Sequence, residues 1–220
     1  MEKEKSKPYE APPQKPVTIA EPVVAYGAIH LNTSMRYTYA DYLTWLDEKR
    51  RELIDGFIHL MSAPVRRHAN VSMTLSLLIG SFIKKKRGQC RIYHAPFDVR
   101  LPIHGSTDDD KVYDVVQPDI CVICDLTKLD DKGCIGAPDL VVEVLSPSSL
   151  MYDCHYKFDL YEKAGVREYW IVNPKEKTIH VFLLKPDGTF DKGTIFESGQ
   201  KAPVSIFDGL TVDLDELFED

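Results

Sequence analysis

The sequence predicts an α/β or α+β domain built on a mixed central β-sheet flanked by helices. Two observations carry this prediction: residues 68–87 place apolar side chains at helical spacing, and from residue 91 onward short runs rich in valine and isoleucine alternate with polar turns. A chain of 220 residues that is 44% hydrophobic can bury a sizeable core.

Residues 1–34 are expected to be a flexible arm, which leaves residues 35–220 as a single domain. The arm holds five prolines with mixed charges and little apolar periodicity. Its first residues lack the apolar stretch of a signal peptide, and no run in the chain approaches the ~18 apolar residues of a membrane-spanning helix. We therefore expect an unexported, cytoplasmic protein without a membrane partner.

The domain is predicted to begin with a short helix and a hairpin. Thr38 is a candidate N-cap for a helix that runs to about Lys49. Residues 51–61 have the pattern of two extended pieces that turn at Asp55-Gly56, a dipeptide typical of tight hairpins. The helix would bury a stripe made of Tyr39, Tyr42, Leu43 and Leu46.

The longest predicted helix spans residues 68–87. It would end at the four cations of residues 84–87, just before Gly88, because cations favour the negative end of a helix dipole and glycine suits the left-handed cap. Steps of four, three and four predict one buried face, made of Val71, Leu75, Leu78 and Phe82.

The rest of the chain is predicted to hold strands and one further helix. The helix is expected over residues 153–164 and ends at Gly165. Strands are expected over residues 91–101, 115–124, 139–145, 168–172, 178–184 and 189–196.

The five cysteines are expected to be reduced thiols, because their number is odd and no export signal precedes them. The spacing of Cys121 and Cys124 suggests a zinc or thiol redox site. On a strand, however, residues three apart point to opposite faces, and no second such pair follows. A zinc or redox protein is therefore the weakest of three functional hypotheses.

The net charge of −7 argues against a strongly basic surface that holds nucleic acid by charge alone. The last eight residues contain five acids and no base, which leaves −2 for the rest of the chain. The sequence is therefore still compatible with a local basic groove.

Three acids interrupt apolar strands, and a buried carboxylate needs a partner. Asp139 follows Pro138 at the start of its strand, where a turn can satisfy it. Asp119 and Glu143 lie among valine and isoleucine. If their strands are neighbours, both can face one cleft and bind Mg²⁺ or Mn²⁺; the alternative is that each pairs with a nearby arginine or lysine.

Lys157 has two interpretations. Asp153, Lys157 and Tyr161 recur at steps of four and share one helix face. Lys157 can be the surface partner of Asp153, or its ammonium can reach the acids, where it would hold a water molecule and offset developing negative charge.

Several segments together form a distinctive pattern. They are residues 52–56, Gln117-Pro-Asp119, residues 136–148, the positions Asp153, Lys157 and Tyr161, and residues 165–174. In this pattern, over about residues 38–215, the chain resembles a large family of restriction-endonuclease-like proteins within the PD-(D/E)xK nuclease superfamily. The resemblance implies the fold of that superfamily, with Asp119 and Glu143 as the two metal-binding acids.

The chain departs from the pattern at Leu145, where the superfamily has its lysine. The resemblance implies that the lysine is relocated to the following helix, as Lys157, and that Glu52 completes the acidic shell. His68 also matches a family position and is a substrate-side candidate. Two further substrate-side candidates come from spacing alone: Gln117, two residues before Asp119, and Tyr161, four residues after Lys157.

The first functional hypothesis is a Mg²⁺- or Mn²⁺-dependent endonuclease that acts on nucleic acid, with DNA the expected substrate and a homodimer the expected assembly. The catalytic set would be Asp119, Glu143, Lys157 and Glu52, of which Asp119 and Glu143 bind the metal. The second hypothesis is a catalytically silent protein of the same fold that binds nucleic acid or a protein partner. The presence of all three acids and the lysine favours the endonuclease, whereas the negative net charge favours the catalytically silent protein.

Overall fold

The computed structural model describes residues 31–47, 49–146 and 156–219. Residues 32–220 form one compact unit. Within the described residues, no helix has the length and apolar character needed to cross a membrane.

One six-stranded sheet has the order β12-β11-β10-β9-β6-β3 and mixes parallel and antiparallel pairs. Strands β9 and β10 are parallel, whereas the other neighbouring pairs are antiparallel. This arrangement, flanked by helices, confirms the predicted fold class. The strands are β3 (Arg91–His94), β6 (Ile120–Ile123), β9 (Leu140–Val144), β10 (Glu168–Asn173), β11 (Thr178–Leu183) and β12 (Thr194–Phe196).

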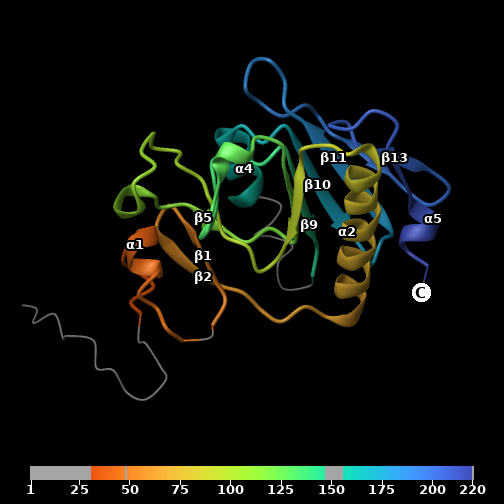
Figure 1. Cartoon of the computed structure of the whole chain (residues 1–220). Helices are drawn as coiled ribbons and strands as arrows, with labels where there is room; N and C mark the ends of the chain where they lie inside the picture. The colour runs from red at the N-terminus through yellow and green to blue at the C-terminus, as the bar shows by residue number, and fades with distance from the viewer. Residues whose placement is uncertain (1–30, 48, 147–155, 220) are drawn as a thin grey trace, which may run out of the picture. The chain divides into compact units, whose positions relative to one another are not determined.

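Helix α2 (Arg66–Lys86) packs against one face of this sheet (Figure 1). It is the predicted long helix, begun two residues earlier. Its buried side chains are Val71, Leu75, Ile79 and Ile83, which share a cluster with strand residues such as Val122 and Trp170. The predicted Leu78 and Phe82 are only partly buried and pack against this cluster. Strands β13 (Lys201–Pro203) and β14 (Thr211–Asp213) and helix α5 (Leu214–Leu217) add residues to this cluster.

Helix α4 (Phe158–Ala164) packs in a second cluster, formed by the other face of the sheet. Its buried residues Leu160 and Tyr161 lie there with Val141 and Tyr169. The first part of the helix predicted over residues 153–164, with Asp153, lies outside the described residues. Gly165 ends the helix in the left-handed conformation, as predicted.

A second six-stranded sheet has the order β2-β1-β5-β4-β8-β7. The predicted hairpin is present, with Asp55 and Gly56 as its turn. The strands of this sheet are β1 (Arg51–Ile54), β2 (Phe57–Leu60), β4 (Val99–Arg100), β5 (Val115–Val116), β7 (Leu129–Asp130) and β8 (Gly133–Ile135).

Two predicted strands are wrong in their extent, because each is split between the two sheets. The segment 91–101 gives β3 and β4, separated by Pro96, which follows a cis peptide bond. The segment 115–124 gives β5 and β6, separated by Pro118. Proline has no N–H to donate to a ladder, so each proline marks the point where the chain changes sheets.

Two other predicted elements are shorter in the structure. Helix α1 (Tyr39–Tyr42) has the predicted Thr38 cap but ends well before Lys49. The predicted stripe does not face a core along its length, since Leu46 is 90% exposed. The strand expected over residues 189–196 is β12 alone, joined to β11.

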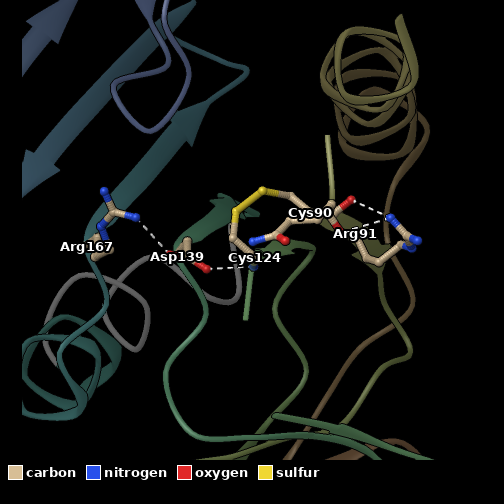
Figure 2. The surroundings of a disulfide bond; sticks show 6 residues. Cys90, Arg91, Cys124, Asp139 and Arg167 are labelled. Carbon is tan, nitrogen blue, oxygen red and sulfur yellow. Dashed lines mark hydrogen bonds and ion pairs between the residues drawn. A yellow bond between two sulfur atoms is a disulfide. The ribbon is translucent and has the colours of Figure 1, made fainter. Parts of the chain in front are cut away.

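The prediction of reduced thiols is wrong for two cysteines. Cys90 and Cys124 form a disulfide, while Cys121 and Cys134 are free and buried; Cys154 lies outside the described residues (Figure 2). Arg91 pairs with Ile123 in the ladder, so Cys90 and Cys124 continue that register by one position. Counting cysteines cannot reveal such a pairing, because it arises only when the two strands become neighbours.

Asp139, at the start of β9, has hydrogen-bond and ion-pair partners close by, as expected. The backbone N–H of Cys124 donates to Asp139 Oδ2 at 2.7 Å, and Arg167 pairs with Oδ1 at 2.9 Å (Figure 2). Asp139 is therefore used within the fold, apart from the other two acids.

Candidate active site

One pocket brings together the four residues of the predicted catalytic set. It has a volume of about 620 Å³, and its described walls include Glu52, Asp119, Glu143 and Lys157. Glu52 comes from the second sheet, whereas Glu143 belongs to the first and Lys157 immediately precedes α4. The site therefore lies where the two sheets and α4 meet. We call it the carboxylate pocket.

Glu52 is placed by the β1–β2 hairpin and is only 1% exposed. Its Oε1 accepts a hydrogen bond from the backbone N–H of Gln117 at 2.8 Å and lies 2.9 Å from Lys157 Nζ. Gln117 lies between the end of β5 and Pro118, where the chain passes from one sheet to the other. The backbone at this crossing therefore holds the Glu52 carboxylate.

Asp119 lies directly before β6 and is held from two sides. Its Oδ2 accepts a hydrogen bond from the backbone N–H of Val144 at 2.8 Å, and the same oxygen lies 3.0 Å from His68 Nε2. Val144 follows Glu143 on β9, and β9 is the neighbour of β6 in the sheet. This hydrogen bond therefore keeps Asp119 close to Glu143. No described residue donates a hydrogen bond to the other oxygen, Oδ1.

Glu143 lies within β9 and accepts two hydrogen bonds on one oxygen. Lys157 Nζ donates to Oε1 at 2.9 Å and the Tyr161 hydroxyl donates at 2.7 Å. Burial raises the pKa of Tyr161 well above its usual value, and the negative charges of Glu143 and Glu52 raise it further. Tyr161 therefore remains a protonated donor at neutral pH and holds the Glu143 carboxylate.

Lys157 is 2% exposed and bridges Glu52 and Glu143. A side chain buried in this way is not on the surface, which contradicts the predicted surface location of Lys157; its predicted partner Asp153 lies outside the described residues. A buried ammonium is stabilised by carboxylates that face it, as Glu52 and Glu143 do here. The third acid, Asp119, is contacted by His68 instead.

His68 and Gln117 both support the acids, but in different places. His68 lies in the first turn of α2 and lines the carboxylate pocket; its Nδ1 is buried and has no hydrogen-bond partner among the described residues. Gln117 is buried and is absent from the described pocket walls. Its side chain bonds instead to Arg50, Tyr42 and Asp98.

The position of Gln117 has a simple cause. The prediction that it shares a strand face with Asp119 assumed one continuous strand, and the break at Pro118 removes that periodicity. The structure thus joins Gln117 to the site through its backbone bond to Glu52.

Arg50 and His59 are among the pocket residues that were not predicted. Arg50 donates Nε–H to Gln117 Oε1 at 3.0 Å, while its Nη2 is buried without a partner among the described residues. Burial lowers the pKa of His59, which favours the neutral ring. The hairpin turn is a signal that could have found His59, because a turn at Asp55-Gly56 pairs residue 52 with residue 59.

The charge of the four-residue cluster bears on metal binding. Glu52, Asp119 and Glu143 carry three formal negative charges and Lys157 one positive charge, so the cluster has a formal charge of −2. That excess and the hard oxygen donors suit a divalent cation such as Mg²⁺. Among the described residues, no group of three or more His, Cys, Asp or Glu side chains is placed to hold a metal by itself.

A family model and a related protein each match more than half of this chain. A family model described as "Uma2: Putative restriction endonuclease" matches residues 39–215. An uncharacterized protein of Synechocystis sp. is 30% identical over 151 residues, which cover 67% of this chain and 74% of that protein.

A solved structure shares the fold. It is the crystal structure of "a putative nuclease belonging to DUF820" from Anabaena variabilis, with a TM-score of 0.66 and 22% sequence identity. The match covers 83% of this chain and 97% of that one. The family match over residues 39–215 takes in all four members of the cluster, and the chain therefore belongs to the Uma2 family of restriction-endonuclease-like proteins.

Proposed function

We propose that this protein is a metal-dependent endonuclease that hydrolyses phosphodiester bonds in nucleic acid. The observation that carries the proposal is the convergence of Glu52, Asp119, Glu143 and Lys157 on one pocket in a chain of this family. Cleavage of DNA is a further part of the proposal and rests on the family description. Assembly as a homodimer is also part of it and rests only on the expectation stated from the sequence.

Asp119 and Glu143 would hold the cation, with Mg²⁺ or Mn²⁺ as the candidates. Asp119 Oδ1 and the excess negative charge of the cluster support this assignment. A bound divalent cation would supply a Lewis acid and a more acidic water molecule.

The chain's own residues would do the positioning. His68 and the Val144 N–H hold Asp119, while Tyr161 holds Glu143. Lys157 would hold the attacking water beside the phosphorus and stabilise the negative charge that develops as the leaving P–O bond breaks in line. Glu52 keeps the Lys157 ammonium at that position.

The test is a cleavage assay on plasmid DNA, single-stranded DNA and RNA, with Mg²⁺, Mn²⁺ or chelator present. Cleavage should require the metal and should disappear in Asp119→Ala and Glu143→Ala. A useful control is Asp125→Ala, because Asp125 is an exposed acid before a short 3-10 helix and is absent from the described pocket walls. Cleavage that survives chelation, or that both site variants retain, would contradict the proposal.

The second candidate is a protein of the same fold that binds nucleic acid or a protein partner without cutting it. Leu145 at the superfamily's lysine position and the net charge of −7 favour it. Binding of nucleic acid in the cleavage assay without any cut product, in both metals, would select this alternative.

A further inference from the structure

The carboxylate pocket also has an apolar wall that the proposed chemistry does not need. β2 and the segment that follows it contribute one side of this wall, and α2 contributes the other. Two large apolar side chains of this wall are exposed to solvent: Leu60 is 67% exposed and Met73 is 57% exposed. We call these residues the apolar wall: Ile58, Leu60, Met61, Ala63, Pro64 and Met73.

Cations are scarce on the same walls. The described pocket residues include two, Arg50 and Lys157, and Lys157 is held by Glu52 and Glu143. Proteins that grip a duplex by its backbone neutralise several phosphates with lysine and arginine. The described walls do not form such a basic track.

Arg50 is the cation that can face a ligand. It forms no ion pair with a described residue, and its Nη2 is buried without an acceptor. Because Arg50 lines the pocket and no described carboxylate neutralises it, its guanidinium can form charge-assisted hydrogen bonds to an anionic oxygen there. One anion-binding group beside an apolar wall suits a ligand that has a phosphate at one end and a flat, weakly polar body at the other.

The size of the pocket agrees with such a ligand. A volume of about 620 Å³ lies in the range of pockets that enclose one compact ligand. A base can fill a pocket of this kind only when it is unstacked, because a stacked and paired base hides its faces.

We infer that the carboxylate pocket takes a nucleic-acid strand that is unpaired where it crosses the acids, with one base against the apolar wall and its phosphate near Arg50. This inference rests on the proposed function and names its substrate class. It covers both DNA and RNA, since both supply an unpaired base and a phosphate.

The experiment measures binding separately from cutting. Fluorescently labelled single-stranded DNA, single-stranded RNA and duplex DNA of the same sequence are titrated with the full chain in chelator, so that cleavage cannot interfere. A single strand should bind at least about tenfold more tightly than the duplex. The DNA and RNA arms show which sugar is accepted.

Matched variants test the wall. Met73→Ser should weaken single-strand binding by about fivefold or more, because it removes apolar surface that would cover the base. Leu77→Ser is the control: it lies one turn further along α2, is 61% exposed and is absent from the described pocket walls. Thermal unfolding of both variants checks that each is folded.

The outcomes separate this inference from the proposed function. Tight single-strand binding that Met73→Ser weakens and Leu77→Ser does not would support the inference, even if no metal produces cleavage. Equal binding of duplex and single strand, or equal effects of Met73→Ser and Leu77→Ser, would overturn it even if cleavage is efficient. Absence of binding to all three probes would also overturn it, and the cleavage assay would then decide the function alone.

Discussion

The ammonium of Lys157 lies 2.9 Å from an oxygen of Glu52 and 2.9 Å from an oxygen of Glu143. The two acids belong to different sheets, so this one side chain links them electrostatically. Leu145, two residues after Glu143 and directly after β9, is buried in the cluster with α4 and leaves the positive charge to Lys157.

Replacement of Lys157 should separate chemistry from binding. We expect Lys157→Ala to lower turnover by about a hundredfold or more while metal affinity changes little, because the ammonium acts mainly in the transition state. Lys157→Arg should fail as well, since a planar guanidinium cannot place a compact charge at the same point. Single-turnover cleavage at saturating metal measures the rate of both variants. A wild-type rate in Lys157→Ala would show that Lys157 takes no part in the chemistry.

Replacement of the two acids should abolish metal binding. Asp119→Ala and Glu143→Ala each remove one of the two proposed carboxylate ligands, so isothermal calorimetry with Mn²⁺ should show no saturable binding in either variant. Asp139→Ala is a matched control, because that acid bonds to the Cys124 N–H and Arg167 instead. Unchanged Mn²⁺ affinity in both site variants would exclude this metal site.

At the scale of elements, the disulfide connects the start of β3 to the end of β6. Cys124 follows β6, whereas Asp119 precedes it, so the bond and the carboxylate pocket lie at opposite ends of that strand. The two cysteines are 34 residues apart, and closing such a loop restricts the unfolded chain.

Loss of the disulfide should therefore affect stability and leave the pocket intact. We expect the variant with Cys90→Ser and Cys124→Ser to lose about 2–4 kcal/mol of unfolding free energy. Urea denaturation with and without reductant measures this, since reductant should destabilise the wild type and not the double variant. An effect of reductant that is equal in both would show that the bond does not contribute.

Strand β10 carries a buried acid that serves the fold. The Glu168 side chain accepts hydrogen bonds from the Trp170 indole and from the backbone N–H groups of Ser205 and Ile206. Burial nevertheless raises its pKa above the ordinary value of 4.5, against the opposite effect of these donors. Ionisation of Glu168 is thus harder in the folded chain than in the unfolded one.

This shift predicts the sign of a pH dependence. A group whose folded pKa is raised favours the folded state most below its unfolded pKa, and that contribution is lost as the pH rises from about 4.5 through the folded pKa. The destabilisation caused by Glu168→Gln should therefore be larger at the acidic end of this range than at neutral pH. Thermal unfolding across this range measures it, with exposed Glu197→Gln as control, and a destabilisation that grows with pH would contradict the assignment.

At the scale of the whole molecule, residues 32–220 form one compact unit that contains every described residue of the site. The family match, over residues 39–215, falls within that unit. Independence of the first segment from the folded domain is still a prediction of the sequence.

Removal of residues 1–30 tests it. A variant that begins at residue 31 after an initiator methionine should unfold in one cooperative transition, at nearly the temperature of the full chain, because the described members of each core cluster lie at position 37 or later. Calorimetry of both chains provides the comparison. A large fall in the unfolding temperature would show that the first residues belong to the domain.

Local features of this protein were predictable from sequence because they depend on neighbours along the chain. The turn at Asp55-Gly56 sets the register of β1 and β2, and helical spacing from Val71 onward defines α2. The unusual position of Asp119 and Glu143 in apolar runs marked them as candidates, and their strands are indeed neighbours in the sheet.

Long-range features were decided by the tertiary structure alone. The pairing of strands brings Cys90 to Cys124, and the changes of sheet at Pro96 and Pro118 split two apparent strands. Burial places Lys157 between Glu52 and Glu143. Periodicity and propensity report which side chains share a face of one element, but not which elements become neighbours. That choice depends on how the two sheets and α4 together bury apolar surface. The resemblance could therefore imply that Lys157 and Glu52 share a site with the acids, but the contact of one ammonium with acids from two sheets is a property of the folded chain.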